Sequence, residues 1–140
     1  MPTKILLSIK PEFAAKIFAE EIEKIFAQKF FDEKKDYEFR RVIFAQKGVK
    51  TVVVYASHPA CKVIGEFEIE DILHKKIGQL WQETRHAAGI AKAYFDEYFA
   101  GKTLGYAIKI KSRKLYRPEK CLTKDFGIQY PPQSFVYIND

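Results

Sequence analysis

The stretch that decides the fold is a charged turn running into a strand, Glu33-Lys34-Lys35-Asp36-Tyr37-Glu38-Phe39-Arg40-Arg41. Glu38 and Arg40 lie two residues apart, so on a strand their side chains leave the same face. Lys35 comes just before the strand, near the start of that face. A lysine, a carboxylate and an arginine that converge there can bind an anion or move a proton. The simpler alternative is an exposed ion-pair cluster at a turn.

The segments around this stretch alternate between strand and helix patterns. Apolar or alternating runs predict strands over residues 3–9, 37–44, 51–56, 63–71, 104–113 and 134–138. Helical spacing of apolar residues predicts helices over residues 12–28, 73–88 and 90–98. Several strands follow one another without a helical crossover, which argues against a doubly wound parallel sheet. We therefore expect an α+β fold in one domain over residues 1–140, a mixed or antiparallel β-barrel with flanking helices.

The composition excludes several classes of protein. A chain that is 47% hydrophobic and 15% aromatic is neither disordered nor fibrous. No apolar run approaches the roughly 20 residues of a membrane helix, and the N-terminus carries no export signal. Two cysteines, Cys61 and Cys121, do not make a disulfide framework. These observations predict a soluble, cytoplasmic protein without a membrane partner.

The positive charge is concentrated near the C-terminus. The net charge is +6, and residues 101–140 contain 8 Lys or Arg but only 3 Asp or Glu. On the predicted strand, Lys109, Lys111 and Arg113 share one face, with cations about 7 Å apart that can follow a phosphate backbone. Tyr116, which follows them, can stack on a base. The alternative is a solvated strand face with an ordinary buried tyrosine.

Other chemical patterns in the sequence are weak. His58 and Cys61 form a His-x-x-Cys pair, but a zinc site needs four ligands and no matching pair accompanies them. No Ser-His-Asp arrangement can be assembled around Ser134, at the start of the last predicted strand. No glycine-rich phosphate loop is present. We therefore predict no metal and no cofactor site from the residues alone.

The charged stretch resembles the signature of ASCH domains, which belong to the PUA-like superfamily. That signature is Gly-x-Lys-x-x-Glu-x-Arg, and it is matched by Lys35, Glu38 and Arg40, whereas Glu33 stands at the glycine position. The resemblance continues through residues 4–11, 63–67, 105–108 and 131–135 and covers nearly the whole chain. The helix before the signature looks longer than in the family, by about two to three turns.

The resemblance implies a barrel of about six strands with a cleft between barrel and helices, lined by the signature residues. Family members resemble RNA-binding modules, and some resemble small hydrolases: metal-dependent ribonucleases or amidohydrolases that act on acylated cytidine. In the amidohydrolase branch the lysine is catalytic and a threonine stands at the glutamate position. Glu38 therefore argues against a direct transfer of that activity.

Three functions follow as hypotheses. The first is binding of RNA or a modified nucleotide in a basic cleft, by Lys35, Glu38, Arg40, Lys109, Lys111, Arg113, Tyr116 and Ser134. The second is a small hydrolase in which Lys35 and Glu38 are catalytic, with a divalent metal if it is a ribonuclease. The third is a protein-interaction or regulatory module, for which the acidic strand face of Glu66, Glu68 and Glu70 would suit a partner.

Overall fold

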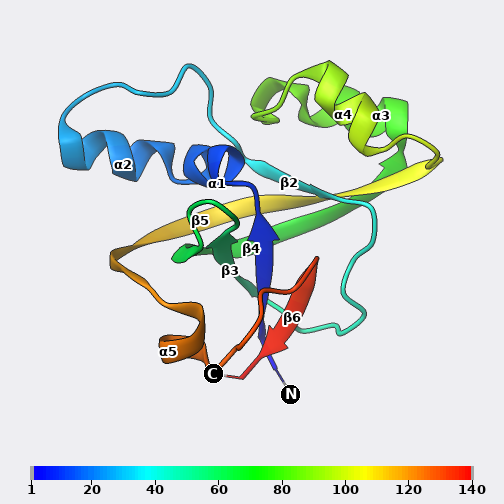
Figure 1. Cartoon of the computed structure of the whole chain (residues 1–140). Coiled ribbons are helices and arrows are strands. Elements are labelled where there is room, and N and C mark those ends of the chain that lie inside the picture. Colours follow the sequence, from blue (N-terminus) through cyan, green and yellow to red (C-terminus); the bar gives the residue numbers. More distant parts are fainter. Residues whose placement is uncertain (1, 140) are drawn as a thin grey trace.

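The six predicted strands assemble into one mixed sheet in the computed structural model, which describes residues 2–139. The strands are β1 (Lys4–Ile9), β2 (Tyr37–Arg40), β3 (Thr51–Ala56), β4 (Lys62–Lys76), β5 (Leu104–Lys120) and β6 (Phe135–Ile138). Their order across the sheet is β2-β5-β4-β3-β1-β6. β1 pairs with β3 in parallel, and the other pairs are antiparallel. The predicted α+β class with a six-stranded mixed sheet is confirmed (Figure 1).

The sheet does not close into a barrel. Its two edge strands, β2 and β6, form no ladder with one another over residues 2–139. Side chains span this open edge instead, because Arg40 at the end of β2 donates a hydrogen bond to Ser134, just before β6. The predicted closed barrel is therefore replaced by a curved open sheet.

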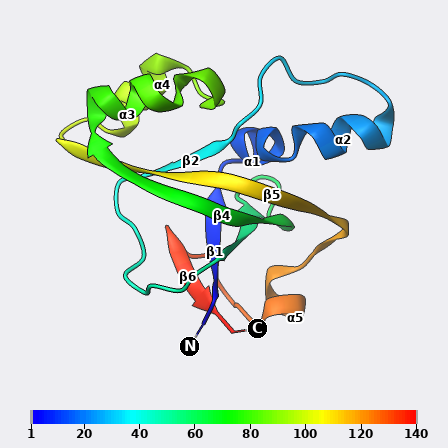
Figure 2. The same cartoon turned by 180° about the vertical axis from the view of Figure 1, so that it is seen from behind.

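β4 and β5 form a long antiparallel pair that is longer than the sequence predicts. Their register runs from Val63 opposite Lys120 to Lys76 opposite Leu104, with three irregularities between. Residues 73–76, predicted as the start of a helix, belong to β4, and β5 continues past the predicted end at residue 113 to Lys120. Leu73 satisfies both a helical and a strand pattern, and pairing with Ala107 decides in favour of the strand. Figure 2 shows the two strands crossing the whole molecule.

The helices lie around this pair (Figures 1 and 2). They are α1 (Pro11–Ile17), α2 (Ala19–Phe26), α3 (Ile77–Thr84), α4 (Lys92–Tyr98) and α5 (Leu122–Phe126), with a 3₁₀ turn, η1 (Arg85–Ala87), after α3. The helix predicted over residues 12–28 is broken at Phe18, whose fully buried ring packs in the main core. The periodicity did not reveal this break, because Phe18 is apolar and falls on the same predicted face.

The core consists of three clusters of buried hydrophobic side chains, and one of them supports the candidate site. It lies under α3 and α4, where the ring of Phe95 contacts Phe39 at 5.2 Å and Phe99 at 4.8 Å between centroids. Leu80 and Thr84 are fully buried, so α3 presents the inner face that its spacing predicts. In the part of the chain that the structure describes, no helix is long and apolar enough to cross a membrane.

Candidate functional site

A cavity of about 810 Å³ opens at the edge of the sheet where β2 faces the segment before β6. α1 and α4 contribute walls, through Phe13 and Tyr94 respectively. Four residues singled out from the sequence line this cavity together: Lys35, Glu38, Arg40 and Ser134. The prediction that Glu38 and Arg40 share one face of a strand beside the first helix is confirmed.

Lys35 lies at the base of the cavity and is only 2% exposed. Its Nζ donates to the carbonyl oxygen of Ala88 at 3.1 Å and lies 3.8 Å from Oε1 of Glu38. It also lies over the rings of Phe13 and Phe39, at 5.7 and 4.9 Å from their centroids. Burial lowers the pKa of Lys35 to about 8, against the opposing effect of the Glu38 carboxylate. The ammonium is thus charged in most molecules at neutral pH but loses its proton far more easily than a surface lysine.

Glu38 links Lys35 to Arg40, which in turn contacts the segment before β6. Its second carboxylate oxygen, Oε2, accepts a hydrogen bond from Nη1 of Arg40 at 3.2 Å. Nη2 of the same guanidinium donates to Oγ of Ser134 at 2.7 Å. One carboxylate therefore lies between two cations in a chain of four polar groups. This buried arrangement excludes the alternative of an exposed ion-pair cluster at a turn.

The turn at residues 87–89 holds Lys35 in place. Asp36 donates its backbone N–H to the carbonyl of Ala87 at 2.9 Å. Gly89 has a φ of +68°, and a Cβ added there would lie 2.6 Å from Cβ of Lys35. Lys16 donates to the carbonyl of Gly89 at 3.0 Å and to Oε1 of Glu33 at 3.1 Å. Glu33, where the family signature has glycine, therefore helps to fix the helix against this turn.

Several cavity residues were not predicted as functional. Tyr94 packs edge-on against Phe13 with centroids 4.9 Å apart, and Nζ of Lys10 lies 5.1 Å from the Tyr94 ring centroid. Tyr55 and Tyr98 also line the cavity. Tyr94 and Tyr98 are one helical turn apart, a spacing that is equally typical of a buried helix face. Only the position of α4 beside the open sheet edge shows that these tyrosines line a cavity and do not simply form a buried helix face.

The basic strand lies outside this cavity. Lys109 pairs with Glu70 of β4 at 2.8 Å, and Lys111 is exposed. Arg113 does not share their face, which corrects the prediction. Between Ile110 and Arg113 the β5 strand contains one extra residue, because Ile110 and Arg113 oppose Ile69 and Phe67 of β4. The bulge turns Arg113 to the core face, where it donates to Asp36 Oδ1 at 2.5 Å and to the carbonyl of Lys35.

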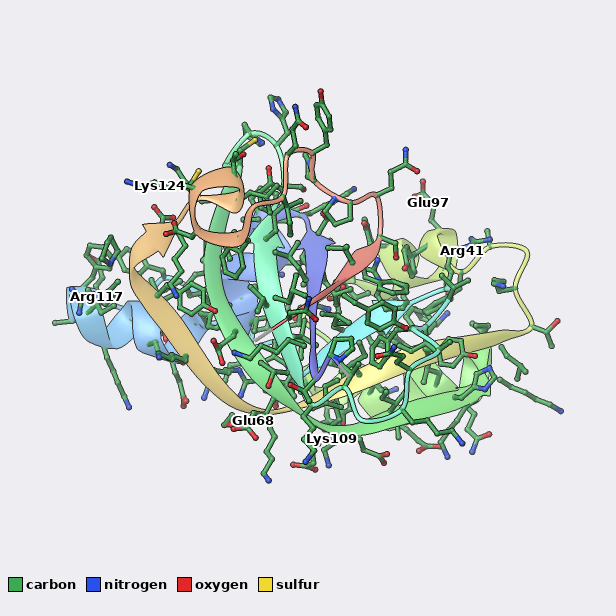
Figure 3. The ribbon with its side chains drawn as sticks, turned by 90° about the horizontal axis from the view of Figure 1, so that it is seen from below. Arg41, Glu68, Glu97, Lys109, Arg117 and Lys124 are labelled. Atoms are coloured by element: carbon green, nitrogen blue, oxygen red, sulfur yellow. The ribbon has the colours of Figure 1, made fainter. Side chains whose placement is uncertain are left out.

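Tyr116 and two residues of the acidic strand face, Glu66 and Glu70, have partners within the sheet. The hydroxyl of Tyr116 donates to Oε1 of Glu66 at 2.7 Å, and burial raises the pKa of Tyr116. Nζ of Lys120 lies 4.4 Å from the centre of its ring. These contacts favour the ordinary buried tyrosine over a base-stacking one. Figure 3 shows Lys109 and Glu68 together at one edge of the molecule, away from Arg41.

The described residues contain no group of three or more His, Cys, Asp or Glu side chains able to hold a metal ion. His58 and Cys61 both line the cavity, on the wall formed by the segment after β3. A divalent metal thus remains a prediction that applies only to the ribonuclease hypothesis.

Comparison with known proteins agrees with this fold. No family model matches the chain. A solved structure, of a serine-to-alanine variant of the ASCH protein from Zymomonas mobilis, superposes with a TM-score of 0.82, covering 100% of this chain and 92% of that chain at 23% identity. A relative named ASCH domain-containing ribonuclease, from the same species, is 27% identical over 115 residues, which are 81% of this chain and 78% of the relative. This chain shares the fold of the ASCH protein from Zymomonas mobilis.

Another relative carries a different name. It is the protein named large ribosomal subunit protein uL22 from Ureaplasma parvum serovar 3, which is 31% identical over 113 residues, or 80% of this chain. This chain spans about a third of the length of that relative, at 36%. The solved ASCH structure and the ribonuclease-named relative are matched over 92% and 78% of their lengths and are therefore the more informative comparisons.

Proposed function

We propose that the cavity binds an unpaired nucleotide of RNA, with a phosphate group at the Lys35–Arg40 end. The observation that carries this proposal is the convergence of two cationic side chains on one carboxylate, Glu38, at the base of a roomy cavity. Glu38 holds both cations in position, and together they keep an excess of positive charge. Charge-assisted hydrogen bonds to phosphate are among the stronger ones in proteins.

The charge of the cavity lining supports an anionic ligand. Its described lining residues include four cations, Lys10, Lys35, Arg40 and Arg41, and one carboxylate, Glu38. Arg40 is about nine-tenths buried, with a side-chain exposure of 12%, so its charge is poorly screened by water. An anion entering here meets a net positive field in a partly desolvated site.

The shape and the aromatic wall support a nucleotide rather than a bare anion. A volume of about 810 Å³ falls within the range of small-molecule sites. Phe13 and Tyr94 offer ring surfaces on one wall, and unpaired bases bind proteins by stacking on such rings. A base within a duplex cannot reach them, so we infer single-stranded RNA. The relative named as a ribonuclease is consistent with RNA as the partner.

Binding measurements with matched variants test this proposal. A nucleoside 5′-monophosphate and a single-stranded RNA with 2′-O-methyl riboses are titrated into the wild-type chain and into Lys35→Met and Arg40→Met. Each variant removes one cation and is expected to weaken binding of both ligands by about tenfold or more. Lys124→Met removes an equal charge on α5, distant from Arg41 in Figure 3, and should leave binding unchanged. Equal affinities in all four proteins would overturn the proposal.

A second candidate function is hydrolysis of the bound RNA. The favouring observation is the Lys35 pKa of about 8, which leaves about one molecule in ten with a neutral amine at pH 7. In such a reaction the 2′ oxygen attacks phosphorus, Lys35 takes the 2′ proton, and the bond to the 5′ oxygen breaks, which leaves a 2′,3′-cyclic phosphate. The 5′ oxygen takes a proton from water, and the hydroxide so formed takes back the proton from Lys35. Arg40 would offset the charge that develops on the phosphate.

Turnover assays separate this candidate from binding alone. Short RNAs and acylated nucleosides are incubated with the protein, with and without a divalent metal. If the chain hydrolyses RNA through Lys35, the rate should rise with pH up to about 8 and vanish in Lys35→Met. Binding without turnover of RNA at any pH would exclude this second function. Hydrolysis of acylated nucleosides alone would favour the amidohydrolase alternative.

A further inference from the structure

A second hollow adjoins the cavity on the far side of the chain that leaves β2. Its volume is about 520 Å³, and it lies between this chain and the turn that leads from α4 into β5. Arg41 and Val42 line both the cavity and this hollow. A ligand that extends beyond the cavity past Arg41 therefore enters the second hollow.

Strand register places an aromatic platform in this hollow. Arg40 of β2 pairs with Tyr106 of β5, and Tyr106 pairs with His74 of β4. Residues opposite one another on paired antiparallel strands point to the same face, so Tyr106 and His74 share the face of Arg40. Their rings are stacked, with centroids 4.0 Å apart and planes within 8°. Both rings line the hollow.

The charge around this platform is positive. Arg41 and Lys102 line the hollow, and no carboxylate is found among its described lining residues. Nη1 of Arg41 donates to the carbonyls of Tyr98 and Ala100, at 2.8 and 3.1 Å. These two bonds fix the guanidinium at the junction between cavity and hollow without cancelling its charge. Figure 3 shows Arg41 at the α4 end of the molecule.

We infer that this hollow is a second nucleotide subsite, which holds the nucleotide next to the one in the cavity. The inference rests on the proposed function and sharpens it: the ligand is an RNA chain, not a free nucleoside. The backbone phosphate between the two nucleotides lies near Arg41, and the second base stacks against the His74–Tyr106 platform. A stacked pair of flat rings accepts any base, so this subsite adds affinity with little sequence preference.

The experiment compares a 5′-mononucleotide with a tetranucleotide that carries 2′-O-methyl riboses. Affinities are measured for the wild-type chain, Lys102→Glu and Lys124→Glu. Both substitutions change the net charge equally, but only Lys102 lines the hollow. We expect the wild type to bind the tetranucleotide at least tenfold more tightly than the mononucleotide. Lys102→Glu should remove most of that gain and leave mononucleotide affinity within twofold, whereas Lys124→Glu should preserve both affinities.

A second pair of variants tests the platform itself. Tyr106→Ala should weaken tetranucleotide binding about tenfold, and Tyr106→Phe, which keeps the ring, should not. If Tyr106→Ala fails to fold, as circular dichroism would show, Lys102→Glu at the exposed turn still decides the question.

The outcomes distinguish this inference from the proposed function. A tetranucleotide that binds no more tightly than the mononucleotide, or equal losses in Lys102→Glu and Lys124→Glu, would overturn the second subsite while the cavity proposal stands. Absence of binding of either ligand, or affinities indifferent to Lys35→Met, would overturn both.

Discussion

Nη2 of Arg40 donates a hydrogen bond of 2.7 Å to Oγ of Ser134, joining residues that are 94 positions apart in the sequence. The bond spans the open edge of the sheet, where no backbone ladder joins β2 to β6 within residues 2–139. Ser134 is held in turn by its carbonyl, which accepts the N–H of Ser8 at 3.2 Å. The cavity wall formed by residues 131–134 is therefore held by individual side-chain and backbone hydrogen bonds and not by a strand ladder to β2.

Loss of the Ser134 hydroxyl should loosen this wall. Ser134→Ala removes the acceptor of a charged donor that is largely buried, and we expect unfolding to become easier by about 1–3 kcal/mol. Ser112→Ala, at an exposed position on β5, is the control and should change stability by less than about 0.5 kcal/mol. Urea unfolding measures both. Equal effects of the two substitutions would show that the Arg40–Ser134 bond contributes nothing to stability.

Gly89 should tolerate alanine far less well than Gly127, although both have a φ of +68°. At Gly127 nothing lies within 4 Å of the added Cβ, so only the left-handed backbone opposes the change, by about 1–2 kcal/mol. At Gly89 the Cβ also meets Cβ of Lys35 at 2.6 Å. We expect an additional loss of about 1–3 kcal/mol from overpacking, measured by thermal unfolding. Similar losses at both positions would contradict the tight packing of the turn against Lys35.

The depressed pKa of Lys35 predicts a specific dependence of stability on pH. The unfolded chain keeps the Lys35 proton up to about pH 10.5, whereas the folded chain releases it near pH 8. Between these values the unfolded state binds more protons, so raising the pH stabilises the fold. The stability of the wild type relative to Lys35→Met should therefore rise by on the order of 3 kcal/mol across this range. Urea unfolding measures the free energy of unfolding of both proteins at each pH. If the two values change with pH in parallel, the pKa of Lys35 is not lowered in the folded chain.

The basic strand remains a second proposed contact with phosphates. Lys109→Ala combined with Lys111→Ala should weaken binding of every RNA sequence and flatten the decline of affinity with salt. Lys24→Ala combined with Lys29→Ala removes an equal charge from exposed positions at the end of α2 and after it, and should do neither. Fluorescence anisotropy over a salt series measures both pairs. Identical salt slopes in the two double variants would limit phosphate binding to the cavity and its neighbouring hollow.

The signature residues of the site could be predicted from sequence because their geometry is local. Residues two apart on a strand share a face, whatever the rest of the fold does, so Glu38 and Arg40 were placed correctly. Ser134 reaches them only through the sheet order. That order depends on the parallel pairing of β1 with β3 and on β6 joining the far edge, neither of which is apparent from the periodicity.

The prediction for the basic strand was wrong for Arg113 because one extra residue in β5 reverses the alternation of side chains. A bulge of this kind depends on pairing with β4, and the sequence of β5 carries no signal for it. Similarly, the helical spacing of Tyr94 and Tyr98 is typical of core residues in an amphipathic helix. They become cavity residues only because α4 packs beside an open sheet edge.

The most direct test of the central claim is a crystal structure of the protein soaked with a 2′-O-methyl dinucleotide that carries a 5′-phosphate. We expect the 5′-phosphate within hydrogen-bond distance of Arg40 or Lys35 and the bridging phosphate near Arg41. One base should lie against the Phe13–Tyr94 wall and the other on the His74–Tyr106 platform. Density for the dinucleotide elsewhere on the surface, with none in the cavity, would contradict the central claim that this cavity is the RNA-binding site.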